Sequence, residues 1–400
     1  MNILIIGAGW EQHALIQRIK DLGHHIIATH PKSDAESFPL ADETFVKESR
    51  DIEGHLEIAE KGSIDAVVTD NCDYSLYTAS VIAAKLDLPF ASIQSAVLSN
   101  DKFEQREQVS KNEIKQPGYY KVRDLNELKE AASILGYPVI LKPLDNRGTF
   151  GITVIRKEEE LKDAFIDAVS NSYSHQLICE QFIDGTLVTV DGFCFKNGHQ
   201  SLTVASSISE KGSKPVTKRT IYPASFSDEL NNCLMNNHHK VVESLGYDYG
   251  HTHGEYMVTE DEQIYFVECT NRGGGVYISS LIVPLLTGID VNKMLVQQSL
   301  GKKLDIPFKE NQGIDYMKRS VVLAFHDFKV GGTIKSINLE EMRSLVYTER
   351  FRTIFKENDI VESVENCAAR HTVIVVKGEN AREAEENFER FKSNLDVQYT

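Results

Sequence analysis

Residues 251–258 read HTHGEYMV, and residues 265–275 read YFVECTNRGGG. Both segments alternate apolar and polar residues, which is typical of strands, and an acidic turn at residues 260–262 separates them. The two segments therefore predict a β-hairpin with Glu255 on one strand and Glu268 on the other. Such a hairpin brings two carboxylates together near one end of a sheet.

Two neighbouring carboxylates repel each other and raise each other's pKa unless a cation lies between them. Mg²⁺ is often held by one or two carboxylates together with the phosphates of a substrate. Arg272 and three glycines follow Glu268, and they add a fixed cation and a backbone that a ligand can approach closely. The stretch therefore predicts a metal and phosphate site, whereas the alternative is an ordinary surface hairpin with exposed glutamates.

Composition narrows the class of protein. A chain of 400 residues is too long for a single core, so we expect about two to four domains. A net charge of −16 argues against nucleic acid or an anionic membrane as the main partner. The six cysteines form no C-x-x-C pair and predict free thiols in a reducing compartment. The apolar run at the start of the chain has no charged leader and predicts a strand, and no run is long enough for a membrane span. We therefore expect a cytoplasmic protein.

Residues 1–100 alternate strand-like and helix-like segments, which predicts a parallel sheet covered on both faces. The predicted strands lie at residues 2–6, 25–29, 66–69 and 89–91, and the predicted helices at residues 11–22 and 74–86. The first turn reads GAGWEQ, in which Gln12 stands where the dinucleotide fingerprint G-x-G-x-x-G requires glycine. This turn therefore favours a tight connection in a substrate-side domain over a nucleotide site.

Changes in residue composition and pattern divide the rest of the chain into three further predicted domains. Residues 101–192 predict a small antiparallel sheet with helices on one face, after a polar helix. Residues 193–312 predict a second lobe that contains the hairpin, and residues 313–400 predict a β-rich domain that ends in a helix. The fold class is therefore α/β combined with α+β.

Four further features suit a bound nucleotide, although each has an ordinary structural explanation. Lys142 ends the buried strand VILKP, where a lysine either reaches water or holds an anion. The loop NRGTFG at residues 146–151 offers free backbone N–H groups to a phosphate, but it lacks the G-K-[ST] element of a Walker loop. Lys102 starts a helix, where the dipole disfavours a cation unless an anion binds nearby. Residues 180–183 end a strand and could present a backbone edge to adenine.

In chain order, these features resemble the ATP-grasp superfamily. The shared motifs are Asp101-Lys102, Lys142, the glycine-rich loop, Glu-x-x-Ile at residues 180–183, Glu255 and Glu-x-x-x-Arg at residues 268–272. The sequence is most similar to the carboxylate–amine ligases, including L-amino acid ligases, and more distantly to biotin carboxylase and purine-pathway enzymes. The resemblance covers nearly the whole chain and implies a Rossmann-like N-terminal domain, a two-lobed ATP-binding region and a C-terminal β-rich domain. It also implies ATP and Mg²⁺ (or Mn²⁺) as cofactors.

The resemblance implies three groups of site residues. The residues that contact ATP are Lys102, Lys142, Gly148, Thr149, Gly151, Glu180, Gln181 and Ile183. The metal ligands are Glu255, Glu268 and Asn271, and the catalytic residues are Arg272 and Lys142.

Two positions depart from the family pattern. Leu187 stands where the family often has a ribose-binding glutamate, and Asp191 is a candidate substitute. Thr270 stands where the family often has a metal-binding asparagine, and Asn271 follows it. The second metal position is therefore open between these two residues.

Two other groups of residues leave alternatives open. The basic loop at residues 209–219 either receives a substrate carboxylate or is a solvated loop. His251 and His253 could form a zinc pair, but no third ligand has suitable spacing, and His253 lies on the same strand face as Glu255.

We expect an ATP-dependent ligase that joins a small-molecule carboxylate, such as an amino acid, to an amine and releases ADP and phosphate. The alternatives are an ATP-grasp carboxylase that uses bicarbonate, a nucleotide-binding regulatory protein with a degenerate site, and, on the G-x-G turn alone, an NAD-dependent oxidoreductase. The expected partners are the two small-molecule substrates. The oligomeric state is open, with a homodimer as the common form among relatives.

Overall fold

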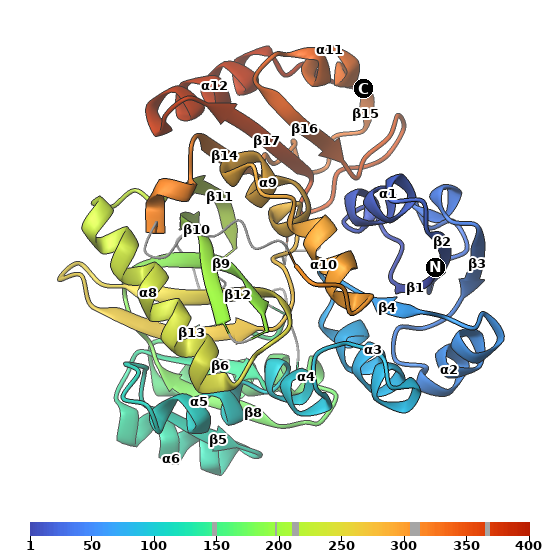
Figure 1. Ribbon diagram of the computed structural model, residues 1–400. Helices are drawn as coiled ribbons and strands as arrows, with labels where there is room; N and C mark the ends of the chain where they lie inside the picture. The colour runs from blue at the N-terminus through green and yellow to red at the C-terminus, as the bar shows by residue number, and fades with distance from the viewer. Residues whose placement is uncertain (146–149, 197, 210–215, 305–312, 365–368) are drawn as a thin grey trace.

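The structure is a computed structural model of the chain, and it describes all residues except 146–149, 197, 210–215, 305–312 and 365–368. It contains two four-stranded sheets, one eight-stranded sheet and one two-stranded sheet (Figure 1). No helix within the described ranges is long and apolar enough to cross a membrane.

The N-terminal domain is built on a parallel sheet in the strand order β3-β2-β1-β4. Alternate residues of β1 enter different cores, because Ile3 and Ile5 pack on one face while Leu4 and Ile6 pack on the other. The sheet is therefore buried on both faces, as predicted. Its elements are β1 (Asn2–Ile6), α1 (His13–Asp21), β2 (His25–His30), β3 (Glu43–Val46), α2 (Ile52–Lys61), β4 (Ala66–Val68) and α3 (Asp73–Leu86). Residues 89–91, predicted as a strand, form no strand and lead into α4 (Ile93–Ser99).

The turn after β1 is filled by the chain itself. The Gln12 side chain is 6% exposed and lies over the turn, where its Oε1 accepts a hydrogen bond from the Gly9 N–H at 3.0 Å. Its Nε2 donates to the carbonyl of Asp70, after β4, at 3.1 Å. Since β1 and β4 flank the point where the strand order reverses, Gln12 links the two loops that border the usual ligand crevice of such a sheet.

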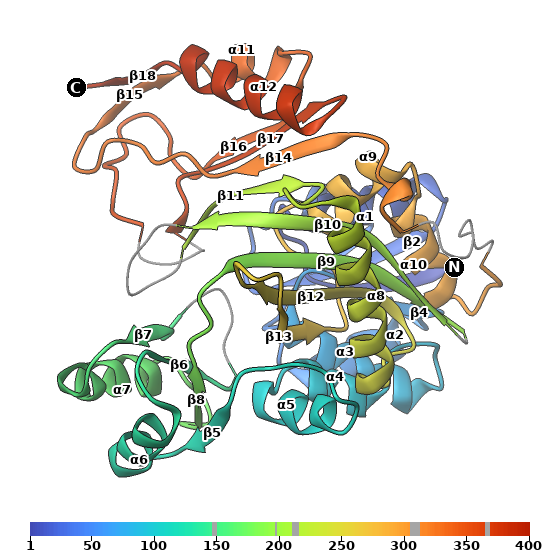
Figure 2. The ribbon, with the colours of Figure 1, turned by 90° about the vertical axis from the view of Figure 1, so that its left-hand side faces the viewer.

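A small lobe follows, with the antiparallel strand order β5-β8-β6-β7. Two helices pack on this sheet and on each other, and the lobe has a core of its own. Figure 2 shows the lobe beside the large sheet. Its elements are β5 (Tyr119–Val122), α6 (Leu125–Leu135), β6 (Val139–Pro143), β7 (Thr153–Ile155), α7 (Leu161–Ser170) and β8 (Leu177–Gln181), and α5 (Lys102–Ser110) precedes it.

The large sheet has eight antiparallel strands in the order β13-β12-β9-β10-β11-β14-β17-β16. The predicted boundary at 192/193 falls inside β9, and the boundary at 312/313 separates strands that belong to this one sheet. The strands are β9 (Thr186–Phe195), β10 (Gly198–Ser209), β11 (Thr217–Tyr222), β12 (Gly250–Val258), β13 (Ile264–Thr270), β14 (Ser320–Ala324), β16 (Thr348–Thr353) and β17 (Thr372–Gly378). Helix α8 (Asp228–Leu245) packs against β10, and α12 (Ala381–Asn394) packs against β17 (Figure 2).

The N-terminal domain and the large sheet share one continuous core. Residues of β1, such as Ile3, belong to the same apolar cluster as Phe193 of β9 and Val321 of β14. The segment that joins them contains a π-helix (Ile278–Ile282), α9 (Val283–Thr287) and α10 (Val291–Ser299). The remaining elements are β15 (Ile334–Ile337), α11 (Leu339–Ser344) and β18 (Val397–Tyr399), with short 3-10 helices at Phe38–Leu40, Glu158–Glu160 and Gly313–Tyr316.

Replacement of Gln12 tests the link between the two loops. The change Gln12→Ala removes one hydrogen bond to each loop, and we expect the free energy of unfolding to fall by about 1–3 kcal/mol. Chemical denaturation measures this loss. The control is Gln17→Ala, because Gln17 donates only to the exposed Asp21 on the surface of α1. Equal stability of the two variants would contradict the role of Gln12.

Candidate active site

Glu255 and Glu268 lie directly opposite each other in the pairing of β12 with β13. Opposite residues of an antiparallel pair point to the same face of the sheet, with Cβ atoms about 4.5–5.5 Å apart. Their side chains keep 29% and 27% of their surface exposed. Two carboxylates therefore face a common, partly open space, which suits a divalent cation that takes further ligands from a phosphate.

Lys102 approaches this pair from the start of α5. Its Nζ lies 3.2 Å from Oε2 of Glu268. Burial alone would lower the pKa of Lys102, but the carboxylates of Glu268, Asp73 and Glu255 together raise it. The lysine is therefore held as a cation beside the carboxylate pair.

His253 extends the polar face next to Glu255. Its Nδ1 lies 2.8 Å from Oδ1 of Asp191 on β9, and its Nε2 lies 3.9 Å from Oε1 of Glu255. Burial would lower the pKa of His253, but Asp191 and Glu255 together raise it to about 10. For Glu255 the signs are reversed. Burial would raise its pKa, but His253 and the two lysines, Lys142 and Lys102, lower it. Lys142 of the small lobe therefore acts electrostatically on a carboxylate of the large sheet.

Glu180 forms a buried ion triad. Oε1 of Glu180 accepts a hydrogen bond from Nε of Arg106 at 2.7 Å, and Oε2 lies 2.7 Å from Nζ of Lys142. The side chains of Arg106 and Glu180 are each 1% exposed. Burial would raise the pKa of Glu180, but the charges of Arg106 and Lys142 lower it to about 2. Sequence analysis missed Arg106, although it lies four residues after Lys102 and therefore on the same face of α5.

At the backbone beyond β8, which is the predicted adenine edge, two of three successive N–H groups are hydrogen-bonded within the chain. The N–H of Gln181 donates to the carbonyl of Gly118 at 2.9 Å, and the N–H of Phe182 donates to Pro138 at 3.2 Å. The N–H of Ile183 has no hydrogen-bond partner within the described part of the chain. One backbone donor at this strand exit is therefore available to a ligand.

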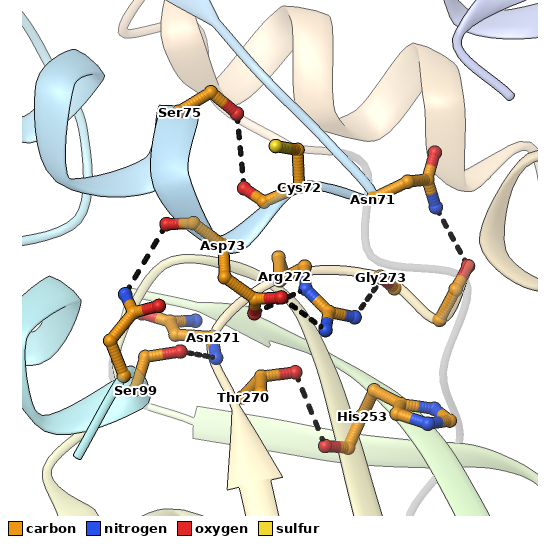
Figure 3. A network of polar contacts seen from close by, with 12 residues as sticks. Asn71, Cys72, Asp73, Ser75, Ser99, His253, Thr270, Asn271, Arg272 and Gly273 are labelled. Carbon is orange, nitrogen blue, oxygen red and sulfur yellow. Dashed lines mark hydrogen bonds and ion pairs between the residues drawn. The ribbon is translucent and has the colours of Figure 1, made fainter. Parts of the chain in front are cut away.

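Arg272 is anchored to the N-terminal domain. Its Nε and Nη2 donate to the two carboxylate oxygens of Asp73 at 2.7 and 2.9 Å, and its Nη1 donates to the carbonyl of Gly273 (Figure 3). Burial would lower the pKa of Arg272, but Asp73 raises it further above its ordinary value. Sequence analysis missed Asp73, which is 199 residues away from Arg272 in the chain.

The glycines after Arg272 dock into the crevice between the loops that follow β1 and β4. The Gly273 N–H donates to Oδ1 of Asp70 at 2.7 Å, and Nδ2 of Asn71 donates to the Gly274 carbonyl at 2.7 Å. On the other side of the crevice, the carboxylate of Glu11 accepts a hydrogen bond from the Val276 N–H. The chain's own loop is therefore bound where an open α/β sheet usually binds a ligand.

Asn271 does not face the carboxylate pair, contrary to its prediction as a metal ligand. Its Nδ2 donates to the carbonyls of Tyr249 at 2.6 Å and His251 at 3.1 Å, and the residue is 3% exposed. Strand alternation explains the difference, because residues 268 and 270 share one face and residue 271 points to the other. Thr270 is therefore the neighbour on the Glu268 face, and its Oγ1 is 3.5 Å from the His253 carbonyl (Figure 3).

Four other residues were predicted to contact ATP: three in the glycine-rich loop, and Asp191 as a substitute ribose ligand. Gly148 and Thr149 lie outside the described residues. Gly151 has φ +69°, and a Cβ there would lie 2.8 Å from the Cβ of Asn171, so packing alone already requires glycine. Asp191, the candidate ribose ligand, is 3% exposed and engaged by His253, which argues against that role.

The structure also bears on the two alternatives left open for the basic loop and for the histidine pair. Lys218 pairs with Asp327, and Nη1 of Arg219 lies 3.8 Å from Oε1 of Glu389, so both cations interact with acidic residues of the C-terminal region. Lys211 and Lys214 are outside the described residues. Among the described residues, no group of three or more His, Cys, Asp or Glu side chains could hold a metal, so zinc at His251 and His253 lacks a third ligand.

A carboxylate hairpin in a large antiparallel sheet, faced by Lys102 of α5 and by Lys142 of a separate small lobe, is the arrangement that the resemblance to the ATP-grasp superfamily implies. Residues 135–280 match the family model of the ATP-grasp domain. Residues 135–280 of the chain therefore form an ATP-grasp domain, and this region contains Lys142, Glu180, Glu255, Glu268 and Arg272.

Similar proteins include ligases and carboxylases. The formate-dependent phosphoribosylglycinamide formyltransferase of Prochlorococcus marinus is 26% identical over 212 residues, which are 50% of this chain and 54% of that protein. The alanine–anticapsin ligase of Bacillus amyloliquefaciens is 22% identical over 282 residues, or 64% of this chain and 58% of that protein. The chain thus spans little more than half the length of these curated relatives.

Solved structures agree on the fold. The L-amino acid ligase of Bacillus licheniformis has a TM-score of 0.87 at 19% identity, and the alignment covers 100% of this chain and 98% of that one. The biotin carboxylase domain of the Hydrogenobacter thermophilus 2-oxoglutarate carboxylase, solved with MgADP and bicarbonate, has a TM-score of 0.80 at 17% identity and covers 100% and 90%. The predicted fold class is confirmed.

The buried triad makes a prediction about stability and pH. The pKa of Glu180 falls from 4.5 to about 2 on folding, so its charge stabilises the protein above pH 4.5 and this contribution disappears as the pH falls toward 2. The contribution is about 3 kcal/mol at neutral pH. We expect Glu180→Gln to lower the free energy of unfolding by about 3–5 kcal/mol at pH 7, because two cations lose their partner. The difference from the wild type should shrink below pH 4.5.

Denaturant titrations at a series of pH values measure this difference. The matched control is Glu104→Gln, which changes an exposed glutamate on α5, the helix that carries Arg106. A deficit for Glu180→Gln that stays constant with pH would contradict the assigned cause.

Proposed function

We propose that this protein is an ATP-dependent ligase that activates a small-molecule carboxylate, such as an amino acid, as an acyl phosphate and joins it to an amine. The observation that carries the proposal is the opposition of Glu255 and Glu268 across β12 and β13, with Lys102 3.2 Å from Glu268. The similarity to ligases that form C–N bonds supports it. The proposed cofactors are ATP and Mg²⁺, and the proposed location is the cytoplasm.

The proposed metal ligands are Glu255 and Glu268, with Thr270 on the same face as a weaker third group. When bound, Mg²⁺ neutralises and aligns the β- and γ-phosphates of ATP. The charges of Lys102 and Lys142, which pair with carboxylates in this structure, then have phosphate oxygens as additional partners. These contacts neutralise the charge that builds up during phosphoryl transfer.

The proposed reaction has two steps, phosphorylation of the carboxylate and attack by the amine. An oxygen of the substrate carboxylate attacks the γ-phosphorus, and ADP leaves. The amine nitrogen then attacks the acyl carbon, phosphate leaves, and the nitrogen loses a proton. We assign Arg272 to the negative charge on the acyl phosphate and the tetrahedral species, because Asp73 holds its guanidinium in a fixed orientation at the end of β13.

The main competing function is that of a carboxylase that uses bicarbonate as its carboxylate. The fold likeness to a biotin carboxylase domain favours this second candidate. A nucleotide-binding regulatory protein remains an alternative on the strength of Leu187 and Thr270, and it predicts ATP binding without turnover. A dinucleotide site at the G-x-G turn has lost its support, because Gln12 fills the turn.

A phosphate-release screen tests the reaction class. With MgATP fixed, we expect release only when a carboxylate and an amine are both present, and amino acids supplied singly and in pairs form the first panel. Because the amine discharges the acyl phosphate, ADP and phosphate should appear in equal amounts with the joined product, which mass spectrometry detects. Turnover with bicarbonate alone would replace the ligase by the carboxylase, and ATP binding without release in any mixture would favour the regulator.

Removal of one carboxylate tests the metal assignment. We expect Glu268→Gln to fold normally and to lower kcat by about 100-fold or more, because one charged metal ligand and the partner of Lys102 are lost. The control is Glu260→Gln, in the exposed turn of the same hairpin, which should keep full activity. Steady-state rates and metal titrations provide the measurement, and a fully active Glu268→Gln enzyme would disprove the assignment.

A further inference from the structure

The side chain of Arg50 lies between two tyrosines from different parts of the chain. Its guanidinium carbon is 3.8 Å from the ring centroid of Tyr74 on α3 and 3.9 Å from that of Tyr173, which follows α7. The two rings meet edge to face, with centroids 6.3 Å apart. Arg50 and Tyr74 belong to the N-terminal domain and Tyr173 to the small lobe, so this stack joins two bodies that have separate cores.

On the small-lobe side, the segment that carries Tyr173 holds the side chain of Asp145, which follows β6. Oγ of Ser172 donates to Oδ1 of Asp145 at 2.8 Å, and the N–H of Ser174 donates to Oδ2 at 2.6 Å. Asp145 stands three residues after Lys142, the lysine that acts on Glu255. A shift of Tyr173 would therefore be passed to the backbone that follows β6 and to the lysine at its end.

On the N-terminal side, the stack lies next to the anchor of Arg272. Tyr74 directly follows Asp73 at the start of α3, and Asp73 holds the guanidinium of Arg272 through two hydrogen bonds. The first turn of α3 therefore contacts the proposed acyl-phosphate residue through Asp73 and the small lobe through Tyr74 and Arg50.

Tyr173 is largely exposed, so its contact with Arg50 differs from the packing of side chains in a core. The residue keeps 65% of its surface exposed, so burial contributes little to its position and the stack with Arg50 contributes much of it. A cation–π contact at an exposed site shifts an equilibrium by about 2- to 5-fold. Such a contact is strong enough to bias the placement of a lobe and weak enough to break during a catalytic cycle.

We propose that Arg50 and Tyr173 are positioning residues, which hold the small lobe and Lys142 at the correct distance from Arg272 and the carboxylate pair. This inference rests on the proposed function, because it assigns the stack a role in nucleotide binding. Neither residue touches the reacting groups in this assignment. Loss of the stack lowers the affinity of the protein for the nucleotide and leaves the hairpin and its proposed metal ligands intact.

Binding of MgATP and MgADP, measured by calorimetry on the full-length protein, tests the inference. We expect Tyr173→Ala to weaken nucleotide binding by about 2- to 5-fold, because one ring contact is lost. Arg50→Ala loses the same contact between the two bodies and should weaken binding by a similar factor, because its other ring partner, Tyr74, lies in its own domain. Tyr173→Phe keeps the ring and should bind as the wild type does. The matched control is Tyr120→Ala, because Tyr120 is a 40% exposed tyrosine of the same lobe.

A double-mutant cycle separates positioning from general destabilisation. Since Arg50 and Tyr173 act through the same contact, the double variant should bind nucleotide no more weakly than Arg50→Ala alone. Additive losses, or unchanged affinity in both single variants while the wild type binds normally, would overturn the inference and leave the proposed function standing. A wild-type protein that binds neither nucleotide would instead remove the proposed function, and the inference with it.

Discussion

The site depends on the opposition of Glu255 and Glu268 on neighbouring strands of one sheet. Like charges held at this distance are costly unless cations compensate them. The structure already supplies compensation, because Lys102 lies beside Glu268 and the cationic His253 lies beside Glu255. Cations of the chain itself therefore compensate both carboxylates in the folded protein.

The N-terminal domain holds the segment that contains Arg272 and the glycines after it. Its parallel sheet places Glu11 after β1 and the segment of Asp70 and Asp73 after β4, at the edge where such sheets usually bind ligands. Here these side chains bind the segment of Arg272 and its glycines instead. The crevice of this sheet is therefore occupied by a piece of the same chain, and the Gln12 side chain fills the G-x-G turn beside it.

Sequence alone predicted the parts of the site that depend on local pattern. Alternation predicted the hairpin and hence the meeting of Glu255 and Glu268, and the same rule could have identified Thr270 in place of Asn271 as the residue on the Glu268 face. Contacts between distant segments could not be predicted from the sequence, because no local pattern relates Asp73 to Arg272 or Arg106 to Glu180. The domain divisions were read from changes in composition, which do not reveal that strands before and after residue 312 pair in one sheet.

The continuity of that sheet has a consequence for the modularity of the protein. β11, which precedes the predicted C-terminal domain, pairs along its length with β14 inside it. Cutting the chain between them would remove β14, one of the two partner strands of β11, and leave β11 as an exposed edge strand that can pair with other molecules. The C-terminal region therefore completes the large sheet, and gene fusions or domain exchanges at this point would divide one folding unit into two incomplete halves.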